Sequence, residues 1–130
     1  NVIRGLHFQN QPYSQTKLVR VLQGKVIDVV VDIRKKSKTF GEHFYLELSE
    51  KNNEALWIPS GCAHGFLTIE DKNIFIYKCS GEYNPLEEYT IKWNDPEIGI
   101  KWNVKNPIVS KKDQQGMSLT EYKDSKLINA

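Results

Sequence analysis

The chain has 130 residues, of which 39% are hydrophobic and 26% charged, and its 18 basic and 16 acidic side chains leave a formal net charge of +2. This length and composition predict one globular domain. The near balance of charge excludes the basic surface typical of nucleic-acid-binding proteins. No apolar run approaches the roughly 18 residues of a membrane span, and no signal-peptide pattern is present. The two cysteines, Cys62 and Cys79, are expected to be free thiols in a cytoplasmic protein.

Short alternating segments run through most of the chain. From Val26 to Ile33, β-branched side chains with a period of two predict a strand. Gln23-Gly24-Lys25 just before it predicts a hairpin turn. Further strands are expected at residues 4–9, 17–22, 42–49, 56–58, 64–69, 74–79, 88–93 and 108–110. No useful helical periodicity precedes the tail after Gly116, which should be a frayed helix or coil. The pattern predicts an all-β protein, an antiparallel sandwich or small barrel.

The first residues of the chain combine Arg4, His7 and Lys17 with apolar neighbours. If the first segment is a regular strand, Arg4 and Leu6 face one way, and Gly5 and His7 face the other. On this stretch alone, the simplest interpretation is a core histidine with solvated cations.

The segment from Pro59 to His64 matches the second half of the cupin signature, Pro-x-Gly-x-x-His. In a metal-binding cupin, the first half supplies two histidines one residue apart and a carboxylate. This sequence lacks that half, because His7, His43 and His64 lie far apart, and His43 is most simply a surface residue. We therefore expect a cupin-like barrel whose pocket uses neither a metal nor another cofactor. A metal-dependent oxygenase is the disfavoured alternative.

The remaining polar side chains suit acid–base chemistry. A histidine can act as a base, and a carboxylate can hold its tautomer and stabilise its imidazolium. A phenol can supply a proton, and a lysine can stabilise a developing oxyanion. The candidates are His7, His64, Asp113, Tyr77, Tyr83 and Lys17. Taken singly, each has a simpler structural interpretation, such as a core aromatic, a turn residue or a solvated cation.

Six motifs occur in order between residues 2 and 113. They are Arg4-Gly5-Leu6-His7-Phe8-Gln9, Gln15-x-Lys17-Leu18-Val19, Gly24-x-Val26-x-Asp28-Val29-x-Val31-Asp32-x-Arg34, Ser37-x-Thr39-Phe40-Gly41, Ile58-Pro59-x-Gly61-x-Ala63-His64-Gly65-Phe66 and Trp93-Asn94-Asp95-Pro96. In these motifs the chain resembles the dTDP-4-dehydrorhamnose 3,5-epimerases of the cupin superfamily. The resemblance implies an antiparallel double-stranded β-helix, also called a jelly roll, and a homodimer.

The resemblance also implies a reaction. Family members take the nucleotide sugar dTDP-4-dehydro-6-deoxy-D-glucose and invert C3 and C5, giving dTDP-4-dehydro-L-rhamnose on the route to dTDP-L-rhamnose, without a metal or cofactor. By position, the implied base is His7 with Asp113 as its partner, the implied acid is Tyr77, and Lys17 stabilises the enolate. The implied substrate contacts are Arg4, His64, Tyr83, Glu88 and Lys112.

Members of this family have a segment of strands and loops before the Arg4–His7 motif, which adds substrate contacts and helps to build the dimer. The sequence begins at Asn1 without a Met, so we expect residues 1–130 to be one cupin-like epimerase domain that lacks this segment. Two alternatives stay open. One is an epimerase that inverts a single centre or takes a related 4-keto nucleotide sugar, and the other is a non-catalytic module that binds sugar nucleotides.

Overall fold

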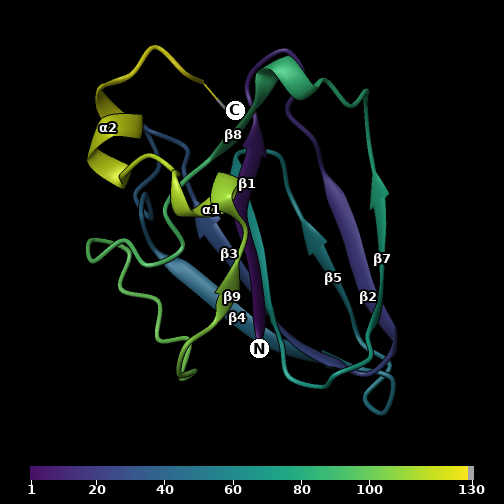
Figure 1. The fold of residues 1–130 in the computed structure, drawn as a ribbon. Coiled ribbons are helices and arrows are strands. Elements are labelled where there is room, and N and C mark those ends of the chain that lie inside the picture. Colours follow the sequence, from purple (N-terminus) through teal and green to yellow (C-terminus); the bar gives the residue numbers. More distant parts are fainter. Residues whose placement is uncertain (129–130) are drawn as a thin grey trace.

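The computed structural model describes residues 1–128 and contains two facing β-sheets. The larger sheet has the strand order β4-β3-β6-β1-β8, with β9 beside β1, and the smaller has the order β5-β2-β7 (Figure 1). The elements are β1 (Val2–Gln9), β2 (Lys17–Gln23), β3 (Lys25–Asp32), β4 (His43–Ser49), β5 (Ala55–Ile58), β6 (Cys62–Thr68), β7 (Ile74–Cys79), the 3-10 helix η1 (Pro85–Glu87), β8 (Glu88–Thr90), β9 (Ile108–Val109), α1 (Lys111–Gln114) and α2 (Leu119–Asp124). The all-β jelly-roll prediction is confirmed.

The predicted hairpin around Gly24 is wrong. β2 pairs with β5 and β7, whereas β3 pairs with β4 and β6, so the two strands lie in different sheets. Gly24 has a φ of 84°, a conformation that glycine adopts without steric cost. The turn therefore carries the chain from one sheet to the other, as a jelly roll requires.

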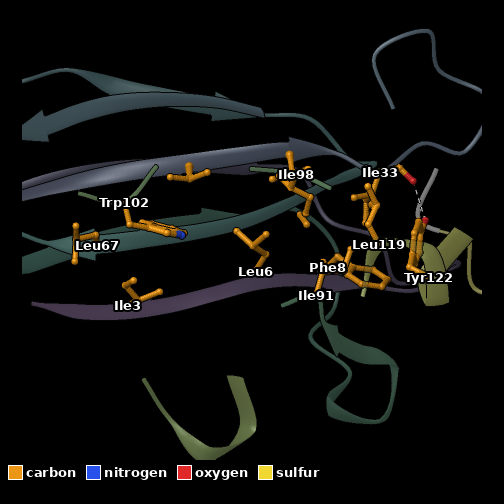
Figure 2. Packing of buried hydrophobic residues seen from close by; sticks show 13 residues of the cluster. Ile3, Leu6, Phe8, Ile33, Leu67, Ile91, Ile98, Trp102, Leu119 and Tyr122 are labelled. Carbon is orange, nitrogen blue, oxygen red and sulfur yellow. Dashed lines mark hydrogen bonds between the residues drawn. The ribbon is translucent and has the colours of Figure 1, made fainter. Parts of the chain in front are cut away.

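The middle of the larger sheet is buried on both faces. One face packs against the smaller sheet through Val26 and Leu48, which cluster with Val19, Val21 and Ile58. The other face is covered by the chain after β8, with side chains such as Trp102 and Leu119 in the second cluster (Figure 2). This arrangement explains why β3 has buried residues at both odd and even positions. A strand with one solvated face would alternate instead.

Within the tail after Gly116, α2 is a packed helix rather than the expected frayed helix or coil. Ser118 caps α2, and its side chain and that of Glu121 form a reciprocal capping box. Tyr122 is fully buried, lies edge-on to Phe8 and donates a 2.8 Å hydrogen bond from its hydroxyl to the carbonyl of Ile33 (Figure 2). Long-range packing thus stabilises a helix too short to be stable alone.

None of the helices in residues 1–128 has the length and apolar character needed to cross a membrane.

Candidate active site

An irregularity in β1 places Arg4 and His7 on one wall of a pocket. Arg4 pairs with Phe66 of β6 but His7 pairs with His64, so β1 contains one more residue than β6 over this stretch. Both side chains line the pocket, and Leu6 is fully buried in the core. The simple alternation predicted for this strand is therefore wrong, because the extra residue shifts the side chains that follow it.

Two glycines make this irregularity possible. Gly5 has a φ of 116°, and a Cβ there would lie 2.6 Å from the Cα of Gly65 on the neighbouring strand. A Cβ on Gly65 would in turn lie 2.6 Å from the carbonyl oxygen of Arg4. Larger residues at either position would push β1 away from β6 next to the place where His7 and His64 are cross-strand partners.

His7 forms a pair with a buried carboxylate from α1. Its Nε2 lies 2.6 Å from Oδ1 of Asp113, which is 1% exposed. The other oxygen, Oδ2, accepts a 3.1 Å hydrogen bond from the backbone N–H of Gly5. Ser110 caps α1 by accepting from the backbone N–H of Asp113, and α1 lies beside β1 (Figure 1). Both carboxylate oxygens are therefore held, and the available ring nitrogen of His7 is Nδ1.

The opposite wall comes from the smaller sheet. Lys17 on β2 and Cys79 on β7 are cross-strand partners, and Tyr77 lies two residues before Cys79. Burial lowers the pKa of Lys17, while Cys79, Glu88 and, to a smaller extent, Asp28 oppose this shift. Although Tyr77 is 42% exposed in the open pocket, the surrounding protein desolvates its phenol, and this burial raises its pKa well above the ordinary value. The wall thus presents a cation and a phenol that stays protonated.

His64 lies between these walls on β6. It is 3% exposed, its Nε2 lies 2.7 Å from Oδ1 of Asp28 on β3, and its ring meets Tyr77 edge to face at 5.8 Å between centroids. The site prediction did not include Asp28. The available signal was an acidic residue in the middle of a run of β-branched residues, where a solvated side chain is not expected.

The rim of the pocket carries a cluster around Glu88. Its Oε2 lies 2.6 Å from Nζ of Lys112 and accepts a 3.1 Å hydrogen bond from the hydroxyl of Tyr83. Burial alone would raise the pKa of Glu88, but the bonds from Lys112 and Tyr83 outweigh it and lower the pKa. The hydrogen bond to Glu88 raises the pKa of Tyr83. The cluster is thus a fixed arrangement of charges beside the catalytic candidates.

The pocket has a volume of about 490 Å³ and an open mouth, and its walls bring the predicted site residues together. Seven of the nine line it directly, namely Arg4, His7, Lys17, His64, Tyr77, Tyr83 and Glu88. Asp113 reaches it through His7, and Lys112 through Glu88. A second hollow of about 570 Å³ is lined by His43, Ile98 and others but by none of the nine. No three His, Cys, Asp or Glu side chains of residues 1–128 are grouped so that they could hold a metal ion.

Comparisons with known proteins agree with this arrangement. A family model described as dTDP-4-dehydrorhamnose 3,5-epimerase matches residues 1–121. The dTDP-4-dehydrorhamnose 3,5-epimerase of Shigella flexneri is 48% identical over 120 residues, which are 92% of this chain and 66% of that relative. The chain thus spans slightly less than two thirds of the length of this curated relative.

Solved structures show the same similarity. A dTDP-6-deoxy-D-glucose-3,5-epimerase from Legionella pneumophila, in complex with dTDP-4-keto-L-rhamnose, has a TM-score of 0.88 and 43% identity, over 92% of this chain and 63% of that one. A 4-keto-6-deoxy sugar epimerase from the novobiocin biosynthetic gene cluster of Streptomyces spheroides has a TM-score of 0.95 and 36% identity, over 99% of this chain and 65% of that one. The chain belongs to the dTDP-4-dehydrorhamnose 3,5-epimerase family.

Proposed function

We propose that this protein is an epimerase that inverts C3 and C5 of dTDP-4-dehydro-6-deoxy-D-glucose, giving dTDP-4-dehydro-L-rhamnose. The observation that carries the proposal is one pocket lined by His7, with its buried partner Asp113, and by Lys17 and Tyr77 from the facing sheet. A base, a cation and a phenol around one cavity are what inversion next to a ketone needs. Family membership supports the nucleotide-sugar substrate.

In the first step, His7 removes a proton from a carbon next to the C4 ketone. The C–H electron pair moves into the C3–C4 or C4–C5 bond, and the ketone oxygen becomes an enolate. Asp113 stabilises the imidazolium that forms, because its charge lies 2.6 Å from Nε2. Lys17 stabilises the negative enolate oxygen. A preorganised charge of this kind contributes about 10² to 10³ in rate.

In the second step, Tyr77 returns a proton to the opposite face of the same carbon, and the ketone re-forms. Tyr77 comes from the smaller sheet and His7 from the larger, so the two groups approach the pocket from facing walls. The raised pKa of Tyr77 keeps its phenol protonated at neutral pH, as a proton donor must be. Exchange with water then returns His7 and Tyr77 to their starting protonation states.

The nucleotide is proposed to bind at the rim. Arg4 and Lys112 offer cations for the diphosphate, and Tyr83 offers a ring that is 61% exposed beside them. His64 contacts the sugar in this proposal, and Glu88 holds Lys112 and Tyr83 in place. The homodimer and the cytoplasmic location stay predictions of the family resemblance and of the cysteine content.

The test is incorporation of solvent deuterium into dTDP-4-dehydro-6-deoxy-D-glucose, followed by NMR at C3 and C5. The proposal expects label and inversion at both carbons. Label at one carbon only would favour a single-centre epimerase, an alternative motivated by the similarity to a 4-keto-6-deoxy sugar epimerase of another gene cluster. Binding of dTDP with no label at either carbon would favour the non-catalytic binding module.

A further inference from the structure

Asp28 is the most deeply buried charged side chain beside the pocket, and the proposed reaction gives it no role. It is 0% exposed, and Oδ1 is engaged with His64. Its Oδ2 is buried and has no hydrogen-bond partner within residues 1–128. Buried polar atoms in proteins are normally hydrogen-bonded, and an unpartnered one costs about 1 to 3 kcal/mol. A residue with only a packing role at this position would be apolar, as are its neighbours Val26 and Val30.

The groups around His64 show what the charge of Asp28 acts on. The titratable and charged groups that line the pocket together with His64 are Arg4 and His7 from β1, Lys17 from β2, Tyr77 and Cys79 from β7, and Tyr83. Glu88 of β8 lines it too. Asp28 is the carboxylate in hydrogen-bond contact with His64, and its charge also interacts with Lys17 and Tyr77.

The direction of these interactions is consistent. Burial raises the pKa of Asp28 and outweighs His64 and Lys17, which both lower it and so favour the carboxylate. In return, Asp28 opposes the lowering of the pKa of Lys17 by burial. One buried negative charge therefore lies behind two groups that can carry a positive charge at the pocket surface.

We propose that Asp28 is a positioning residue that holds His64 with Nδ1 free for the substrate and places a negative charge behind Lys17. The inference rests on the proposed epimerase function, because its purpose is to hold His64 and Lys17 ready for the substrate and the developing enolate oxygen. The enolate oxygen gains negative charge as the proton leaves, so a cation held at Lys17 is complementary to the transition state rather than to the ketone.

Asp28→Asn tests the proposal, because it keeps the size of the side chain and a hydrogen-bond acceptor for His64 but removes the charge. Asp32→Asn is the matched control. Asp32 lies on the same strand and the same face, is also buried, and bonds to Arg34 and Thr39 instead of to pocket residues. Each variant removes one buried carboxylate, but only Asp28→Asn removes the carboxylate that lies behind the pocket.

The first measurement is the ¹⁵N spectrum of the His64 ring at neutral pH in the free protein. We expect Nε2 of His64, which faces Asp28, to carry a proton in the natural protein and in Asp32→Asn, and this preference to be lost in Asp28→Asn. A proton on Nδ1 but not on Nε2 of His64 in the natural protein, or the same spectrum in all three proteins, would overturn the proposal. This measurement needs no activity, so it decides on Asp28 even if the deuterium experiment contradicts the epimerase function.

The second measurement is the pH dependence of kcat. We expect Asp28→Asn to lose about 10² in kcat, with a much smaller change in KM. On the alkaline side of the profile, Asp28→Asn should lose its activity at a lower pH than the natural protein does. The reason is that Lys17 then lacks the negative charge that favours its protonated form. Asp32→Asn should keep the natural profile. An unchanged profile in Asp28→Asn, or an equal shift in both variants, would show that Asp28 only supports the fold.

Discussion

The His7–Asp113 and His64–Asp28 pairs place two imidazole rings opposite each other on neighbouring strands, and in each pair Nε2 lies against a buried carboxylate. They differ in what holds the carboxylate. Asp113 receives a backbone N–H on its second oxygen, whereas the second oxygen of Asp28 is unpartnered within residues 1–128. His7 is also more exposed to the pocket than His64, with 27% of its side chain accessible against 4%.

These differences separate two uses of the same chemical pair. A base must reach its substrate and exchange its proton with water, which suits the more exposed His7 with its fully hydrogen-bonded partner. A fixed charge gains from burial, because its field is less screened there. The carboxylate of Asp28 extends its influence to Lys17 on the facing sheet, and this matches the second use.

Replacing His7 should have the largest effect. His7→Ala is expected to lower epimerisation by about 10⁴ and to abolish exchange of substrate protons, with dTDP binding nearly unchanged because the rim is intact. Solvent deuterium incorporation and dTDP titration measure the two effects. His43→Ala, at the start of β4 and outside the pocket, is the control. Undiminished exchange in His7→Ala would mean that the base belongs to the His64–Asp28 pair instead.

Tyr77→Phe should lower epimerisation by about 10² to 10³. The variant keeps the ring that contacts His64 and Phe75 and loses only the hydroxyl. Because His7 remains, proton removal at C5 should continue without inversion, and NMR in deuterated water would show label in unconverted substrate. A fully active Tyr77→Phe would refute the acid role.

Asp113→Asn should lower kcat by about 10², since an amide cannot stabilise the imidazolium of His7 as a carboxylate does. Combining it with Asp28→Asn tests whether the pairs are independent. If Asp113 acts through the base and Asp28 through His64 and Lys17, the two losses should multiply. A double variant no slower than the slower single variant would mean that both carboxylates support one function.

Asp32→Asn should have the smallest effect on activity and a measurable one on stability. Burial raises the pKa of Asp32, but hydrogen bonds from Arg34, Ser37 and Thr39 outweigh burial and lower this pKa. The ionised carboxylate therefore stabilises the fold at pH values above about 4, the pKa of an aspartate in the unfolded chain. We expect the variant to lose about 2 kcal/mol of unfolding free energy at pH 7.

This loss should shrink as the pH falls below about 4, because the unfolded chain then takes up a proton at Asp32 while the folded protein, with its depressed pKa, does not. Urea denaturation at pH 7 and at pH 3 measures it. An equal loss at both pH values would mean that the contribution of Asp32 does not depend on its charge.

Much of the strand content could be predicted because it depends on local periodicity. The alternation from Val26 to Ile33 predicted β3, which the structure has as Lys25–Asp32. Periodicity says less about the partners of a strand, and the turn at Gly24 was wrongly taken for a hairpin. Periodicity also cannot predict α1, because its four residues form barely one turn. α2 is ordered by Tyr122 in the core, a contact across 89 positions.

The sequence by itself determined the family, through six motifs in order, and the residue types that its chemistry needs. Only the tertiary structure decided which of them meet. His7 and Asp113 are 106 positions apart, and they form a pair because Gly5 allows an extra residue in β1 while α1 docks beside it. Asp28 carries a role only because both faces of β3 are covered, which removes water from its carboxylate. Burial and long-range pairing depend on the whole fold, and local sequence does not contain them.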